Sequence, residues 1–160
     1  MPGKKLALSS AVIAVLFAAV PAFAAEVTPD DYKAQVEPIC KANTQANEKI
    51  LKGVRENVKT GKLSKASRQL SAAAAALKKT RSELLKVPTP AADAARLTKW
   101  LAGVKSEIDL LEAAGKKLAK GEKNGASKMV IRLRSNAMKT NNLVLSYEFR
   151  YCKFEPQKFI

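Results

Sequence analysis

Cys40 and Cys152 are the only cysteines of the chain, so thiol chemistry is the first chemistry to consider. In an oxidising compartment such a pair forms a structural disulfide, which removes both thiols from the reactive groups. We therefore predict a disulfide between Cys40 and Cys152 that joins the first and last parts of the fold. The alternatives are two free thiols or pairing with another chain.

The first 24 residues are typical of a secretory signal, which would deliver the chain to such a compartment. Lys4 and Lys5 are followed by an apolar run over residues 6–20, and Ala22-Phe23-Ala24 offers small residues for cleavage before Ala25. The apolar run is shorter than the roughly 20 residues that span a bilayer. We predict that residues 1–24 are removed and that residues 25–160 form one secreted or envelope-associated domain. A retained anchor is the alternative.

The groups that most enzymes use are missing from the sequence. There is no histidine, so the commonest general base and the commonest metal ligand are absent. No Gly-rich phosphate loop and no Gly-x-Ser-x-Gly motif occurs, and the carboxylates are few and scattered. We predict a protein that is not an enzyme and that uses no cofactor or metal.

Positive charge is the strongest candidate for a binding determinant. The net charge is +15, and loss of Lys4 and Lys5 lowers it to +13. Much of the excess flanks two predicted helix connections, which should lie at one end of a helical bundle. The helix dipole disfavours cations such as Lys65, Arg68 and Lys128 at helix starts, so a partner would explain them better than helix stability. The predicted anion-binding residues are Lys59, Lys62, Lys65, Arg68, Lys117, Lys120, Lys123 and Lys128.

The expected partner is an anionic polymer, an acidic polysaccharide or an anionic membrane surface. No motif for sequence-specific reading of nucleic acid is present. A merely solvated basic end is the alternative, and the oligomeric state is left open.

Aromatic residues gather near the end of the chain. Five of the seven that follow the signal lie in the last 14 residues. We expect them at the disulfide end of the fold, either as core or as a pocket for a small apolar ligand. The predicted lining of that pocket is Tyr32, Trp100, Tyr147 and Tyr151. Asn43 and Asn47, beside Cys40, would add a polar patch that binds a ligand, fixes helix register or simply meets solvent.

Four helices must position these residues. Apolar residues recur at helical spacing, and breaks fall at Gly61, Pro88–Pro90 and 121–125. The first helix is predicted over 28–58, capped by Thr28, with Pro38 kinking it or splitting off a leading helix. The others are predicted over 64–86, from the cap Thr89 to about 120, and over 125–151.

Four amphipathic helices with short links predict an all-α fold, an antiparallel up-down-up-down four-helix bundle closed by one disulfide. In that bundle the start of the first helix lies beside the end of the fourth. Cys40 and Cys152 would then meet at the end opposite the basic residues.

Three segments, YKAQVEPICKAN, VPTPAADAARLTKWL and FRYCKF, resemble a group of uncharacterised exported proteins with two cysteines from high-GC bacteria. The resemblance covers most of the chain after the signal. It implies a secreted, disulfide-closed helical domain and assigns no site residue.

The leading hypothesis is therefore a basic interaction module that binds an anionic polymer or surface. The alternatives are a carrier of a small apolar ligand near the aromatic end, and a structural bundle that binds a protein partner.

Overall fold

The computed structural model describes residues 26–160, so the predicted signal, residues 1–24, lies outside the described part. The described chain is helical and contains no strand, which confirms the all-α prediction. Its elements are α1 (Pro29–Ile50), α2 (Val54–Lys59), α3 (Leu63–Leu84), η1 (Ala91–Asp93), α4 (Ala94–Ala119), α5 (Lys123–Asn142), η2 (Leu145–Tyr147) and η3 (Pro156–Lys158).

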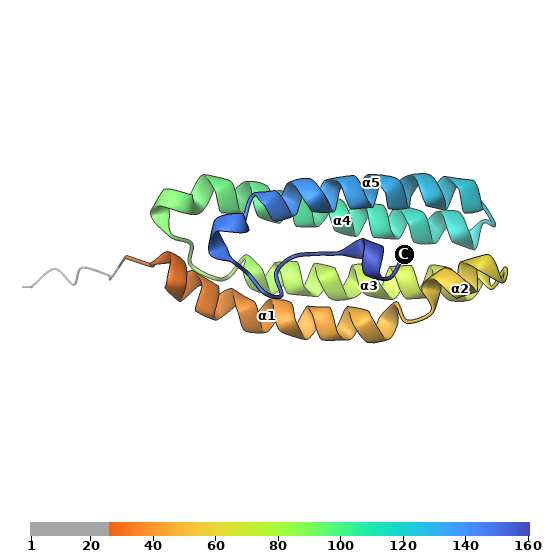
Figure 1. The fold of residues 1–160 in the computed structure, drawn as a ribbon, viewed down its shortest axis with the longest axis horizontal. Helices are drawn as coiled ribbons and strands as arrows, with labels where there is room; N and C mark the ends of the chain where they lie inside the picture. Colours follow the sequence, from red (N-terminus) through yellow and green to blue (C-terminus); the bar gives the residue numbers. More distant parts are fainter. Residues whose placement is uncertain (1–25) are drawn as a thin grey trace, which may run out of the picture.

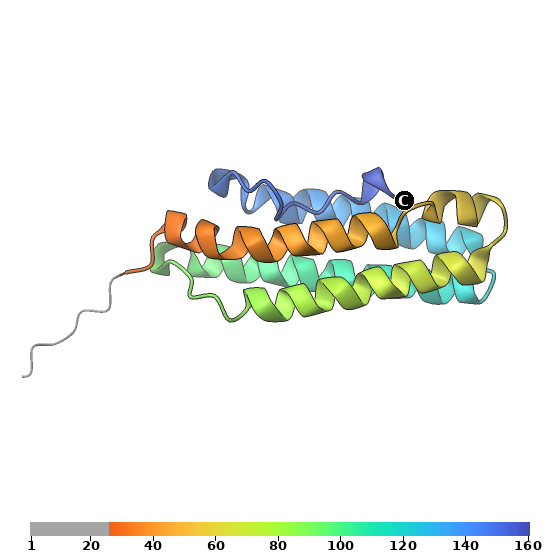
Figure 2. The same ribbon diagram turned by 90° about the horizontal axis from the view of Figure 1, so that it is seen from below.

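The four long helices, α1, α3, α4 and α5, lie side by side (Figures 1 and 2). α3 packs against both α1 and α4, and α4 packs against α5. Residues 143–160 turn back and run between α5 and α1, so irregular chain covers that side of the molecule. We call residues 148–160 the C-terminal segment.

The start of α1 follows the sequence prediction. Thr28 is the N-cap, its side chain accepts a hydrogen bond from the Asp31 amide, and Pro29 occupies the first turn. The Asp31 carboxylate accepts from the Thr28 amide in return, at 3.1 Å, which completes a capping box. The Thr28 hydroxyl also donates to the Asp31 carboxylate, at 2.7 Å, and this bond and the one from the Thr28 amide lower the pKa of Asp31.

The first helix is shorter than the sequence predicted. α1 continues through Pro38, so no separate leading helix forms, and it ends at Ile50. The chain leaves the helix over residues 51–53, where Gly53 has a φ of 73°, and α2 then forms a separate short helix. α2 packs on α3.

The start of the predicted third helix also needs correction. Thr89 does not cap a helix: the chain forms the turn η1 after Pro90, and α4 begins at Ala94. Pro90 has extended backbone angles, with ψ of 132°, so the helix cannot begin before it.

The predicted fourth helix is too long. α5 ends at Asn142 rather than near Tyr151, and Glu148, with φ of 49°, turns the chain back. A helix carries residues two apart to different faces, so it cannot bury both Tyr147 and Phe149. Ending α5 early allows both rings to enter the core, where each is buried.

The predicted disulfide between Cys40 and Cys152 is present, with Cα atoms 5.0 Å apart. Its position differs from the prediction. Cys40 lies near the middle of α1 rather than at its start, and Cys152 belongs to the C-terminal segment rather than to a helix. The bond therefore holds returning chain against the flank of the bundle instead of closing one end.

Polar contacts reinforce the docking of the C-terminal segment. The Glu37 carboxylate of α1 accepts from the amides of Arg150 and Tyr151, the latter at 3.1 Å. The Asn141 side chain of α5 donates to the Phe154 carbonyl at 2.9 Å and accepts from its amide at 3.1 Å. The segment is thus tied to both helices that it separates.

Candidate functional site

The two basic connections do lie together. The α2–α3 and α4–α5 connections are at the same end of the molecule in both views (Figures 1 and 2). Each contains a glycine of positive φ, Gly61 at 79° and Gly121 at 77°, followed by a short hydrogen-bonded turn into the next helix. A side chain would strain both positions, so glycine permits these tight turns.

The eight predicted anion-binding residues surround these connections, and we call them the basic tip. Seven are exposed and Lys117 is half-buried. Lys117 donates to Glu122 at 2.6 Å, and this hydrogen bond is the main reason why the pKa of Glu122 is lowered. Among the described residues the other seven form no ion pair with a carboxylate. Their charge is therefore available to a partner.

The helix starts at the basic tip are unlike the start of α1. Neither α3 nor α5 has a side-chain cap or an acidic residue in its first turn, whereas α1 has both. The free amides at a helix start carry partial positive charge. At the start of α3 this charge adds to that of the lysines, whereas α5 has Glu122 at its N-cap position.

An apolar groove with a volume of about 310 Å³ opens beside the basic tip. Val58, Val130 and Ile131 contribute to its lining, and Ile131 is 62% exposed. Arg55 and Lys123 also line it. The groove therefore combines apolar surface with nearby cations.

The predicted apolar-ligand residues are mostly core. Tyr32, Trp100 and Tyr147 are buried. With Phe149 they form an aromatic cluster in which Tyr32 meets Tyr147 edge-on at 5.6 Å between ring centres, and Tyr147 stacks on Phe149 at 5.0 Å. Trp100 lies 5.9 Å from Phe149. The three predicted rings are brought together, but they pack on one another.

The hydroxyls of the two tyrosines in the aromatic cluster differ in their hydrogen bonding. Burial raises the pKa of Tyr32 to about 12, and its hydroxyl has no hydrogen-bond partner. The Tyr147 hydroxyl donates to Asp93 at 2.6 Å. Burial and this carboxylate raise the pKa of Tyr147, against the opposing effect of Arg96.

Tyr151, the fourth predicted residue, lies apart from the aromatic cluster. It is half-buried, with Lys41 and Arg150 near its ring at 5.6 and 5.3 Å from the centre. It lines a small cavity of about 70 Å³, which we call the central chamber. The chamber lies among α1, α3, α4 and α5 and is covered by the C-terminal segment. The four helices contribute these polar residues to its lining: Asn43, Thr44, Asn47, Glu48, Thr80, Glu107, Thr140 and Asn141.

Glu107 is the residue of the central chamber that sequence reasoning missed. It is fully buried on α4. One of its oxygens lies 3.5 Å from the donating Asn136 amide, whereas Oε2 has no partner. Burial raises the pKa of Glu107 to about 8, although the nearby polar side chains of Thr140 and Asn136 oppose that rise. The signal was available: Glu107 stands three residues after Val104 and four before Leu111, within the apolar stripe of α4.

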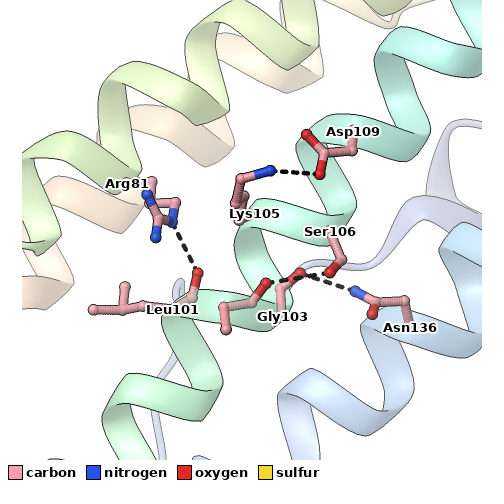
Figure 3. A network of polar contacts seen from close by, with 8 residues as sticks. Arg81, Leu101, Gly103, Lys105, Ser106, Asp109 and Asn136 are labelled. Carbon is pink, nitrogen blue, oxygen red and sulfur yellow. Dashed lines mark hydrogen bonds and ion pairs between the residues drawn. The ribbon is translucent and has the colours of Figure 1, made fainter.

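Side chains from two neighbouring helices fix α4 in place beside Glu107. Figure 3 shows Arg81 of α3 and Asn136 of α5 reaching backbone carbonyls of α4. Arg81 Nε donates to the Leu101 carbonyl at 2.9 Å, and Asn136 Nδ2 donates to the Gly103 carbonyl at 3.0 Å. Buried polar contacts of this kind fix the axial position of one helix relative to its neighbour.

Within residues 26–160, no three His, Cys, Asp or Glu side chains are placed to hold a metal ion. None of the helices in this part of the chain is both long and apolar enough to cross a membrane.

No protein-family model, no curated protein and no solved structure matches this chain.

Proposed function

We propose that the protein binds an anionic polymer or an anionic surface through its basic tip. The observation that carries the proposal is the exposure of seven tip cations that form no ion pair with a carboxylate of the described chain. A polyanion would bring negative charge to all of them at once. The counterions released from the polymer would then favour binding.

The starts of α3 and α5 support the same function. Both helices begin at the basic tip without an acidic residue in the first turn. Lysine and arginine near a helix start lower stability by a few tenths of a kcal/mol each. An anionic partner would turn that unfavourable interaction into a favourable one.

Retention on heparin and on vesicles of anionic lipid tests the proposal. Affinity should fall steeply as salt rises, because each neutralised anionic group releases a counterion. The test variant reverses four tip charges, and the control reverses four exposed lysines elsewhere, so both lose the same net charge. The test variant changes Lys62, Lys65, Lys120 and Lys123 to Glu, and the control changes Lys78, Lys79, Lys86 and Lys99 to Glu.

Log affinity falls with log salt, and this negative slope should become shallower by about 3 in the test variant. Each of the four lost contacts removes roughly 0.7 to 0.9 from the slope. The control should change the slope far less. Equal losses in the two variants would mean that only net charge matters, and the basic tip would not be the binding site. Binding to vesicles but not heparin would identify a lipid surface as the partner.

A second candidate is a carrier of a small apolar ligand. The observation that favours it is the apolar groove beside the basic tip, rather than the aromatic cluster where we expected such a ligand. Binding of a fluorescent apolar probe to the wild-type protein, and its loss in the Ile131→Glu variant, would support this function. A structural bundle that binds a protein partner is the third candidate, and it predicts neither salt-dependent retention nor probe binding.

We also infer an antiparallel up-down-up-down bundle, a secreted or envelope location after cleavage near Ala24, and no catalytic activity. The shared end of the two basic connections supports the topology, and the disulfide is compatible with export. Sequencing the N-terminus of the exported protein tests the cleavage site.

A further inference from the structure

Two buried oxygen atoms of the central chamber have no hydrogen-bond partner. One is Oε2 of Glu107, a residue with no exposed surface, and the other is Oδ1 of Asn47, which is 2% exposed. They belong to α4 and α1, which both contribute to the chamber wall. A buried polar atom without a partner costs about 1–3 kcal/mol, so a bound donor would stabilise the fold.

We propose that the central chamber binds a small organic ammonium ion, with Glu107 as its counter-ion and Asn47 as a second acceptor. This proposal is independent of the basic tip, which binds the opposite charge.

The chemistry of the wall selects a cation that donates hydrogen bonds. Once Glu107 is ionised, both unpartnered atoms are acceptors, so the chamber then repels an anion and favours a cation that donates hydrogen bonds. Trp100, Tyr151 and Phe154 also line the chamber, and aromatic faces attract ammonium groups. The other two amides on the wall already have partners: Asn43 Oδ1 accepts from Asn47 Nδ2 at 3.3 Å, and Asn141 pairs with the backbone of Phe154.

The size of the central chamber limits the ligand. Its volume of about 70 Å³ holds roughly five to seven water molecules at ~10–15 Å³ each. An ion with about five to seven non-hydrogen atoms is therefore the upper limit of size. A short primary alkylammonium ion meets this limit, and its ammonium group reaches Glu107 Oε2 and Asn47 Oδ1 when side chains of the wall shift, because both atoms are buried.

The C-terminal segment forms the cover of the chamber. Cys152 fixes this cover to α1 through the disulfide, and Cys40 itself is part of the wall. The charged groups of the wall, element by element, are Glu48 of α1, Glu107 of α4, and Lys153, Glu155 and Lys158 of the C-terminal segment; α3 and α5 contribute none. Lys158 is paired with Glu155, so Lys153 is the cation that opposes entry.

Binding should depend on pH in a defined direction. The pKa of Glu107, about 8, means that the carboxyl is mostly neutral at pH 6 and mostly ionised at pH 9. An alkylammonium ion, like lysine, keeps its charge to about pH 10. Affinity should therefore rise ten- to a hundredfold between pH 6 and pH 9, with release of one proton from Glu107 when binding occurs near pH 7.

The test uses n-butylammonium chloride and 1-butanol, which are matched in size but differ in charge. Titration of the folded, oxidised protein is followed by calorimetry and by the fluorescence of Trp100, the only tryptophan, which lines the chamber. At pH 9 butylammonium should bind at least tenfold more tightly than butanol. Equal affinity of the two probes, or binding of neither, would overturn the proposal and would mean that the chamber holds water only.

Two variants test whether the ammonium group binds at Glu107. Glu107→Gln keeps the shape of the side chain and removes its charge, so it should weaken butylammonium binding at least tenfold at pH 9 and abolish the pH dependence. Glu112→Gln removes a half-buried carboxyl from the same helix outside the chamber and should change affinity less than twofold. Unchanged affinity in Glu107→Gln would refute the site even if the ion binds elsewhere. The wild-type comparison of the two probes stands whether or not the variant folds.

Discussion

Replacing Glu107 by Gln should make the protein more stable in alkaline solution, and the effect should depend strongly on pH. In the folded state the pKa of Glu107 is raised from 4.5 to about 8, mainly because burial disfavours the ionised carboxylate. Between these two values the folded protein holds a proton that the unfolded chain has released. Unfolding then releases that proton, so the free energy of unfolding falls as pH rises.

The magnitude follows from the size of the pKa change. The pKa rises by about 3.5, and each unit corresponds to about 1.4 kcal/mol. Ionisation of Glu107 therefore destabilises the fold by about 5 kcal/mol above pH 8, and by nothing below pH 4.5. That is a large share of the ~5–15 kcal/mol stability of an ordinary domain. Glutamine has no carboxylate to ionise, so the variant escapes the loss.

Chemical denaturation of the oxidised protein measures this effect. Wild type, Glu107→Gln and the control Glu112→Gln are unfolded in urea at pH 5.5, 7 and 9, in buffers without small amines. The absence of histidine leaves few other groups that titrate in this range. We expect the stability advantage of Glu107→Gln to grow by several kcal/mol from pH 5.5 to 9, and that of Glu112→Gln to stay nearly constant. A constant difference between wild type and Glu107→Gln would refute a buried, neutral Glu107.

Three further outcomes are expected. Reduction of the Cys40–Cys152 disulfide, which spans 112 residues, should lower the free energy of unfolding by about 4–5 kcal/mol in the chain-entropy model. Circular dichroism should still show the helices. Free thiols in freshly exported protein would disprove the bond. Trp100→Ala should lower the free energy of unfolding in urea by about 3–5 kcal/mol, because this side chain is 1% exposed. For the same reason, acrylamide should quench the fluorescence of wild-type Trp100 only weakly. Gly103→Ala should cost about 1–3 kcal/mol, because its Cβ would collide with Thr140 Oγ1 and lie 2.8 Å from Thr140 Cγ2. Adding Thr140→Ala, which removes both of these atoms, should restore part of the loss, and no rescue would argue against this close approach of α4 and α5.

Much of the helical layout could be predicted from local sequence. Apolar residues at steps of three, four and seven identify α3 and α4, because only a helix places such residues on one face. The cap of α1 at Thr28 was also predictable, since Thr-Pro-Asp-Asp satisfies the free amides of a helix start with nearby side chains. The glycines of the two basic connections marked where helices end.

The pairing of Cys40 with Cys152 was predictable from their number and the export signal, but their location was not. Periodicity favoured a helix to Tyr151, and no local signal showed that burying Tyr147 and Phe149 would outweigh further helix. That balance depends on Tyr32 and Trp100, which are distant in the sequence and close in space.

The central chamber was decided by tertiary structure alone. Five separate parts of the chain form its wall, so no window of sequence contains it. Glu107 shows the difference most clearly. The sequence places a carboxyl group in the apolar stripe of α4, but its raised pKa arises only when α5 and the other surrounding elements exclude water from it. Burial is a property of all the neighbours together, whereas helical spacing is a property of one segment.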